Sequence, residues 1–249
     1  LQAAFDMPQS HPGSGIVFTT DATRGVNFGF MDTTIHTGDL LFASLLKYRA
    51  GLQITKLFTQ FGRTRRAAHY GEATTRLKAA LPGVFATESG WLRASTGKSA
   101  QHDVWGTAFA LYVGALEGDV KKRAEQALVK GLREDTIAWE GGIRHVPTDG
   151  DARPDSAWEV SLAGHNTYQN GAYWNTPVGW VVYAVAKADP AAARKLAKDY
   201  VGQIRADDFR QGPDSGAPWE CRHPTENHRQ NPVYLTSVAI PLAVFRELE

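Results

Sequence analysis

The chain has 249 residues, of which 43% are hydrophobic, and its 27 basic and 26 acidic residues leave a net charge of +1. This length and composition allow a sizeable core, and we predict a single domain over residues 1–249. Neither charge forms a long run, which argues against a nucleic-acid partner and against binding to an anionic membrane surface. The single cysteine, Cys221, excludes an internal disulfide and disfavours a thiolate metal site.

The sequence gives no sign of a membrane span or a leader. No apolar run reaches the roughly 20 residues that a spanning helix needs. The start, LQAAFDMPQSHPGSG, lacks the basic and apolar regions of a signal peptide, and it begins without Met, as a trimmed piece would. Exported enzymes often lack disulfides too, so the compartment stays open.

The first elements predicted along the chain are an irregular lead-in and a helical pair. Residues 1–30 are rich in Gly, Thr and Pro and predict irregular structure. Residues 39–61 predict one long helix, or two short ones broken near Gly51. Residues 64–81 predict an outer partner helix with Thr64 as its N-cap, ended by Pro82 and the following glycine.

The same alternation of a buried and an amphipathic helix then recurs. Residues 104–116, VWGTAFALYVGAL, are apolar nearly all round and predict a helix buried on every side. Residues 120–134 carry one apolar face and predict a surface helix. A short β-hairpin is expected at 90–93 and another at 142–146, and residues 147–170 predict a long polar loop of functional character.

The last part of the chain repeats the pattern once more. Residues 177–187, PVGWVVYAVAK, predict another buried helix. Asp189 as N-cap and Pro190 at the first helical position then open an amphipathic helix. Residues 232–248 predict a third apolar helix, with Asn231 as its cap and a kink at the internal proline.

Buried and amphipathic helices in alternation build two concentric layers, so we predict an all-α fold, an (α/α) toroid with short β-hairpins in its loops. A closed ring of six hairpins needs twelve helices, whereas this pattern supplies seven or eight. We therefore expect an incomplete ring.

A polar, aromatic segment precedes each apolar helix: residues 29–39, 99–105, 164–175 and 218–231. If the inner helices run parallel, these segments and the helix N-termini gather at one mouth of the barrel. Such a convergence of polar and aromatic groups predicts a binding site. The loop tryptophans suit stacking on sugar rings, although large amphipathic rings also seal domain surfaces.

Cleavage of a glycosidic bond needs one protonated carboxyl and one ionised carboxyl. Asp32 follows an apolar stretch, FGFM, which is suited to raising the pKa of a carboxyl. Glu220 lies between Trp219 and Cys221, and a buried ion pair with Arg222 is the alternative for it. Four other acids are weaker candidates. Asp39 and Asp103 suit helix caps, and nothing in the sequence around Glu88 or Glu159 points to a catalytic role.

No metal or cofactor is expected. The histidines are scattered without an HExxH spacing, and His223 and His228 suit hydrogen-bonding roles in a loop. The sequence has neither a GxSxG nor a Walker-type glycine loop, so acyl and phosphoryl transfer lack support.

Four segments, kept in order from about residue 27 to the end, resemble the six-hairpin glycosidases, especially their debranching-enzyme-like and glucosidase-like inverting groups. The segments are GFMDTTIHTGDLLFASLLKYRAGLQI, GGIRHVP, YQNGAYWNTPVGW and PWECRHPTENHRQNPVYLTSVAIPLAVF. Each motif alone is weak. The resemblance implies an inverting glycoside hydrolase in which Asp32 matches the general acid and Glu220 the general base.

The resemblance also matches Tyr168, Gln169, Tyr173 and Trp174 to positions that line the substrate. Asn170 departs from the Gln-Gly pair usual in the family, and the missing amino-terminal hairpins imply that another chain or segment completes the cup. The expected partner is thus a carbohydrate substrate, and the full set of substrate-binding candidates is Trp91, His102, Trp105, His165, Tyr168, Gln169, Tyr173, Trp174, Trp219 and Gln230.

Two other functions stay open at this level. A polysaccharide lyase on a similar helical barrel would use a tyrosine or histidine base and a cation, for which Tyr168, His165 and Arg144 are available. A catalytically inactive fragment that binds carbohydrate or acts as a scaffold is the other alternative.

Overall fold

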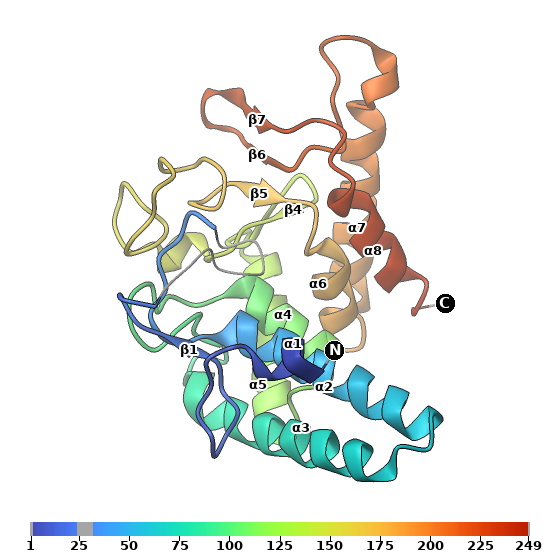
Figure 1. Ribbon diagram of the computed structural model, residues 1–249. Helices are drawn as coiled ribbons and strands as arrows, with labels where there is room; N and C mark the ends of the chain where they lie inside the picture. The colour runs from blue at the N-terminus through green and yellow to red at the C-terminus, as the bar shows by residue number, and fades with distance from the viewer. Residues whose placement is uncertain (1, 24–31, 249) are drawn as a thin grey trace.

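The computed structural model describes residues 2–23 and 32–248, and it places helices beneath a layer of short strands and long loops (Figure 1). Helices α2 (Leu41–Gln60) and α3 (Thr64–Phe85) pack along each other at the bottom of the view. The short helix α1 (Gln2–Asp6) lies against α2. Two further pairs and a last helix follow: α4 (Val104–Tyr112), α5 (Gly118–Arg133), α6 (Val178–Val185), α7 (Pro190–Ala206) and α8 (Thr236–Phe245).

The helices form the two predicted layers. Helices α2, α4, α6 and α8 form an inner row in which each packs on the next. All eight residues of α4 from Val104 to Leu111 are buried. In α6 every residue except Tyr183 is buried. Helices α5 and α7 bury a single stripe each and expose charged residues on the other side. Within residues 2–23 and 32–248 there are eight α-helices, and they form an incomplete (α/α) toroid.

Two helix ends follow the predicted caps. The side chain of Asp103 accepts a hydrogen bond from the Gly106 amide at 2.8 Å, and Asp189 accepts one from the Ala192 amide at 3.1 Å. Each bond satisfies one of the amides left open in the first turn of a helix.

Helix α2 is the single long helix of the two alternatives that the sequence left open. Gly51 is helical, and its missing side chain leaves room for Thr74 of α3 and for Phe5. Two other boundaries were predicted wrongly. Helix α3 begins at Thr64 itself and runs through Pro82 to Phe85. Helix α8 begins only at Thr236, so Asn231 is not its cap.

Short strands cross over the helix ends in chain order (Figure 1). The antiparallel sheet consists of β3 (Ala138–Trp139), β4 (Gly142–Ile143), β5 (Tyr173–Trp174), β6 (Cys221–His223) and β7 (His228–Gln230). A second pair, β1 (Phe18–Thr19) and β2 (Gly38–Asp39), lies near α2. The hairpin expected at 142–146 lies earlier in the chain, as the β3–β4 hairpin over residues 138–143. Residues 90–93 belong to a turn closed by a bridge between Ala86 and Leu92.

The core among the inner helices is aromatic. Phe42 of α2 stacks on Phe109 of α4 with ring centroids 5.1 Å apart, and Phe109 lies 4.8 Å from Trp180 of α6. These contacts tie three successive inner helices together. Among the described residues, no helix combines the length and apolarity that crossing a bilayer would require.

Candidate functional site

The segments that precede the inner helices meet at one end of the helical layer. The amide of Ile35 donates to the Val160 carbonyl at 3.0 Å, which joins the first segment to the long polar loop. The Val104 amide, at the start of α4, donates to the backbone carbonyl of His145, two residues after β4. Trp174 pairs with Cys221 across β5 and β6. Backbone bonds therefore gather the four segments, as the parallel-helix argument predicted.

Asp32 is exposed, and its carboxylate is held by side chains from the polar loop. Oδ1 accepts a hydrogen bond from Gln169 Nε2, and Oδ2 accepts one from the Tyr168 hydroxyl at 3.2 Å. The buried Gln169 is itself fixed, because its Oε1 accepts from the amide and the hydroxyl of Thr33. The apolar stretch at 28–31 that was expected to surround Asp32 lies outside the described residues.

Glu220 is only 4% exposed and precedes strand β6 directly. Its Oε2 accepts a hydrogen bond from Asn231 Nδ2, and its amide donates to the carbonyls of Gln230 and Asn231. Burial raises the pKa of the Glu220 carboxyl, the Asn231 and Tyr234 side chains oppose that rise, and the charge of Asp32 adds to it. Glu220 is therefore a buried carboxyl that feels the charge of Asp32.

Two tyrosines interact with both carboxyls. Burial and then the charges of Glu220 and Asp32 raise the pKa of Tyr168, whose hydroxyl bonds Asp32. Burial also raises the pKa of Tyr234, which hydrogen-bonds Glu220 and feels the charge of Asp32. Asp32 and Glu220 therefore approach one small region, although they lie far apart in the sequence.

The backbone at Tyr168 is unusual, with a φ of +43°, a conformation that costs a non-glycine residue about 1 kcal/mol. Its carbonyl accepts a hydrogen bond from Trp174 Nε1 at 3.1 Å. Asn231, which bonds Glu220, has a φ of +48°. Strained backbone of this kind clusters at functional sites.

The polar loop that holds Asp32 is organised by two buried side chains. Asn170 Oδ1 accepts from Ser156 Oγ and from the amides of Ala157 and Trp158, while its Nδ2 donates to the Ala163 carbonyl. Asn170, which departs from the family pattern, thus fixes the backbone on either side of the loop. Its importance was missed because an amide in a polar sequence carries no pattern of its own.

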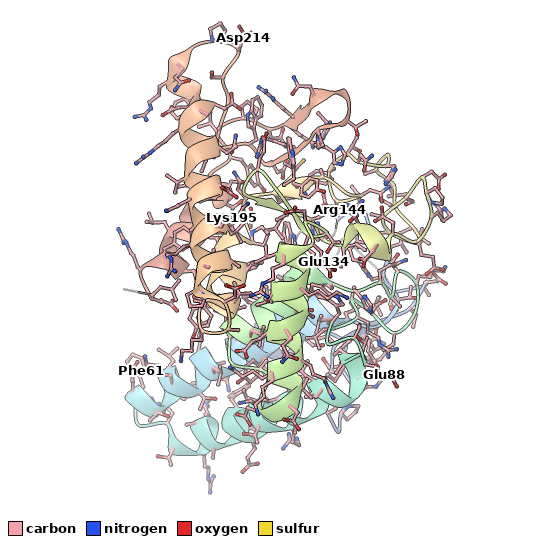
Figure 2. The ribbon with its side chains drawn as sticks, turned by 180° about the vertical axis from the view of Figure 1, so that it is seen from behind. Phe61, Glu88, Glu134, Arg144, Lys195 and Asp214 are labelled. Atoms are coloured by element: carbon pink, nitrogen blue, oxygen red, sulfur yellow. The ribbon has the colours of Figure 1, made fainter. Side chains whose placement is uncertain are left out.

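Arg144 is the second organiser, and it is 2% exposed. Its guanidinium makes a two-pronged ion pair with Asp151 at 2.5 and 2.9 Å. It also donates to the carbonyls of Gly171 and Val146. Figure 2 shows Arg144 above the end of α5 that carries Glu134, inside the loop layer.

The remaining substrate-binding candidates separate by burial. Trp105 and Trp174 are fully buried, and Trp105 stacks on His145 with ring centroids 3.7 Å apart. Both rings therefore belong to the core beneath the site. The predicted contact of these two rings with a sugar does not agree with this burial. Tyr173 is also largely buried and stacks on His223.

The other candidates lie at separate places. Trp91 stacks on His102 at the turn before α4. His165 Nε2 lies 3.5 Å from Asp151 Oδ2. The half-buried Trp219, next to Glu220, donates from Nε1 to Asp207 at 2.5 Å. Gln230 faces Cys221 across β6 and β7.

Three alternatives for the acids are resolved by their contacts. Arg222 pairs with Glu140 at 3.1 Å and lies over the Trp139 ring, so it is not the partner of Glu220. Asp39 lies in β2 and bonds His11, and it does not cap α2. Asp103 caps α4, as described above. No group of three described His, Cys, Asp or Glu side chains is placed to hold a metal ion.

No family model and no curated protein sequence matches the chain. Solved structures do. The GH63 mannosylglycerate hydrolase of Thermus thermophilus in complex with glucose aligns over 83% of this chain and 44% of its own, with a TM-score of 0.56 and 14% identity. An uncharacterized conserved protein of the same organism aligns over 83% of this chain and 48% of its own, with a TM-score of 0.51 and 16% identity.

The fold is that of a toroid glycoside hydrolase. The hydrolase in complex with Tris and D-glycerate gives a similar alignment, with a TM-score of 0.53 and 16% identity. This chain spans less than half the length of these neighbours, in agreement with an incomplete ring. At such identity the likeness concerns the fold alone, and the chemistry has to be argued from the site.

Proposed function

We propose that the chain hydrolyses a glycosidic bond with inversion of the anomeric centre. Asp32 would protonate the departing oxygen, and Glu220 would take a proton from the attacking water. The observation that carries this proposal is that both carboxyls act on the same two tyrosines, Tyr168 and Tyr234. Two carboxyls that interact with the same tyrosines, within a toroid fold shared with glycoside hydrolases, suit this reaction.

The surroundings of Glu220 suit a base, and those of Asp32 leave its carboxyl open to a substrate. Burial makes the Glu220 carboxylate a stronger base, since it raises the pKa of the group. The donors on Asn231 and Tyr234 oppose that rise, because they stabilise the ionised carboxylate. Asp32 is exposed, so a leaving-group oxygen can reach it, and Gln169 and Tyr168 fix its orientation.

The contacts of Arg144 and Tyr168 count against a lyase. A lyase needs a cation free to neutralise a uronate, but the guanidinium of Arg144 is used by Asp151 and by two carbonyls. It also needs a base that ionises easily, whereas burial and two carboxylates raise the pKa of Tyr168.

We further propose that additional helices complete the ring, from another chain or another segment. Helix α8 is apolar all round, yet Leu242 of α8 and Leu235 just before it are 47% and 74% exposed. On α2, at the other end of the inner row, Leu52 is 45% exposed. Leu235→Lys with Leu242→Lys should lower the mass of an assembly between chains, measured by light scattering, or the melting temperature of a longer chain that holds both parts. A double variant that changes neither the mass nor the melting temperature would contradict this proposal.

The catalytic proposal is tested with Glu220→Gln, which keeps the shape of the side chain and removes the base. The substrates are mannosylglycerate, named for a structural neighbour, and a panel of disaccharides, with product anomers followed by NMR. Turnover should fall about 100- to 10,000-fold, and the first product should have the inverted configuration. The matched control is Glu134→Gln, an exposed glutamate at the end of α5, which should keep full activity (Figure 2).

Turnover in Glu220→Gln at the rate of the unmodified chain would remove Glu220 from the mechanism. Sugar binding without any product from the unmodified protein would favour an inactive binding fragment. An unsaturated product absorbing in the near ultraviolet would favour the lyase.

A further inference from the structure

Two neighbouring cavities lie between α2 and the amino-terminal segment, and they share two lining residues, Phe5 and Lys47. The larger cavity has a volume of about 420 Å³ and the smaller one a volume of about 180 Å³. The amino-terminal segment runs alongside α2 (Figure 1), and residues of both line each cavity. None of the residues assigned to the glycosidic site above lines either of them.

The larger cavity is mainly apolar. Its walls include Val17 and Phe18 from the amino-terminal segment, and Phe42 and Leu46 from α2. Leu46 is 36% exposed, so a ligand can enter from the solvent beside it. The volume falls within the roughly 300–1,000 Å³ that is usual for sites that bind small molecules.

Two buried polar side chains also line the larger cavity, and neither is a cation. Asp103 caps α4 through the Gly106 amide, and burial raises its pKa to about 7. The ring of His36 lies edge-on to Trp158, and burial lowers its pKa to about 4, so this imidazole is neutral at pH 7. Among the described lining residues, the cation of the larger cavity is therefore Lys47.

The smaller cavity is basic. Four basic side chains from the amino-terminal segment, α2 and α3 line it: His11, Lys47, His69 and Arg76. The acidic residue in its described lining is Asp6, which accepts a hydrogen bond from the Tyr70 hydroxyl at 3.3 Å. His11 Nε2 lies 2.6 Å from Asp39 Oδ1, whereas Arg76 makes no ion pair within the described part of the chain. The smaller cavity therefore offers positive charge beside an apolar space.

The ammonium group of Lys47 lies where the two cavities meet. Its Nζ is 2.7 Å from Ser10 Oγ, which lines the smaller cavity, and 5.2 Å from the centre of the Phe5 ring, which lines both. An ammonium group has three donors, and Ser10 uses one of them. Burial lowers the pKa of Lys47 and the charge of Asp6 opposes this shift, so an anion near Nζ would stabilise the charged amine further.

We propose that the two cavities form one binding site for a small carboxylate with an apolar tail, such as a medium-chain fatty acid. The carboxylate would accept hydrogen bonds from Lys47 Nζ, with Arg76 as a second positive charge, and the tail would lie along Phe42 in the larger cavity. With the histidines counted as neutral, Lys47 and Arg76 exceed Asp6 by one charge, which suits a monoanion. The site is independent of the proposed glycosidic chemistry.

The probe for the test is octanoate, with octanol as the uncharged comparison. An NMR titration of the complete chain at pH 7 follows the backbone amides of Val17, Phe42 and Ala43, which belong to residues that line the larger cavity. Octanoate should shift these amides in a saturable way and bind at least tenfold more tightly than octanol. Butanoate should bind at least tenfold more weakly than octanoate, because each buried methylene group contributes to the affinity. Glu220→Gln should bind octanoate unchanged, so this result is separable from that of the catalytic proposal.

The decisive variant is Lys47→Met, which keeps an aliphatic side chain of similar length and removes the charge. Its affinity for octanoate should fall at least tenfold, while its affinity for octanol should stay the same. The matched control is Lys56→Met, at an exposed lysine further along α2, which should bind octanoate unchanged. Arg76→Gln should lower the affinity for octanoate about threefold, as expected for an exposed charge.

The proposal is overturned if octanoate leaves the three amides unmoved in the unmodified chain. It is equally overturned if a folded Lys47→Met binds octanoate as well as the unmodified chain does, or if octanol binds as tightly as octanoate. Binding that disappears once further helices complete the ring would assign this space to ring closure and would also overturn the proposal.

Discussion

Asp32 and Glu220 approach the same tyrosines from very different surroundings. Glu220 is buried, and it is fixed by its place beside β6 and by backbone bonds to the β7 segment. Asp32 is exposed, and its described contacts come from Tyr168 and Gln169 of the polar loop. The backbone of Glu220 is thus held by the sheet, whereas the carboxylate of Asp32 is held by two side chains of the loop.

The difference shows where the site is sensitive. Main-chain bonds fix the backbone of Glu220, and its carboxyl is bonded by Asn231 and Tyr234 from the segment that follows β7. The orientation of Asp32 depends on the loop, and the loop depends on Asn170 and Arg144. Changes in the loop should therefore disturb Asp32 while leaving Glu220 in place.

The largest effect on stability is expected for Arg144→Met. The change leaves Asp151 and two carbonyls without their donor, so the free energy of unfolding should fall by about 3–5 kcal/mol. Urea denaturation measures it. Arg153→Met, at the exposed pair with Asp155, is the control and should change stability by less than about 1 kcal/mol. Equal losses in the two variants would contradict a special role for Arg144.

A second change acts on Glu220 alone. Asn231→Gly keeps the positive φ and removes one donor to the carboxylate, so the pKa of Glu220 should rise further. A base must be ionised, so the acidic limb of the kcat/KM profile should move to higher pH, and the peak should fall about tenfold. A limb that stays in place, or moves to lower pH, would argue against Glu220 as the base.

The smallest effect is expected at Asp32. Tyr168→Phe removes one hydrogen bond to an exposed carboxylate, which corresponds to a loss of about 3- to 10-fold in kcat/KM. Steady-state kinetics at the optimum pH measures it. Tyr183→Phe on α6 is the control, because Tyr183 packs against Tyr112 away from the carboxyls. A loss for Tyr168→Phe as large as that for Glu220→Gln would mean that Tyr168 takes part in the chemistry itself.

The helical layers were predictable because burial leaves a periodic trace in the sequence. The apolar residues from Val104 to Leu111 and the stripe on α7 both repeat at helical spacing. Helix ends were less predictable: α3 runs through Pro82 to Phe85, although a proline followed by a glycine predicts a stop at that point.

The site was predictable in its segments and only partly in its details. Asp32 and Glu220 were singled out by their aromatic neighbours and by a family resemblance, and their catalytic roles remain predictions. Tyr234 and the true role of Asn231 were missed, because both depend on a turn that brings the chain back to Glu220. The buried tryptophans were misjudged because sequence alone does not tell a ring beneath a site from a ring in its wall.

The sheet adds its strands in chain order, and this orders the assembly of the proposed site in time. A nascent chain carries Asp32, Gln169 and Tyr168 well before Glu220 is made. A chain that stops short of β6 would therefore lack the proposed base, Glu220, whatever it keeps of the loop around Asp32. On the ribosome, the proposed hydrolysis would be absent until the last strands of the sheet have been made and have paired.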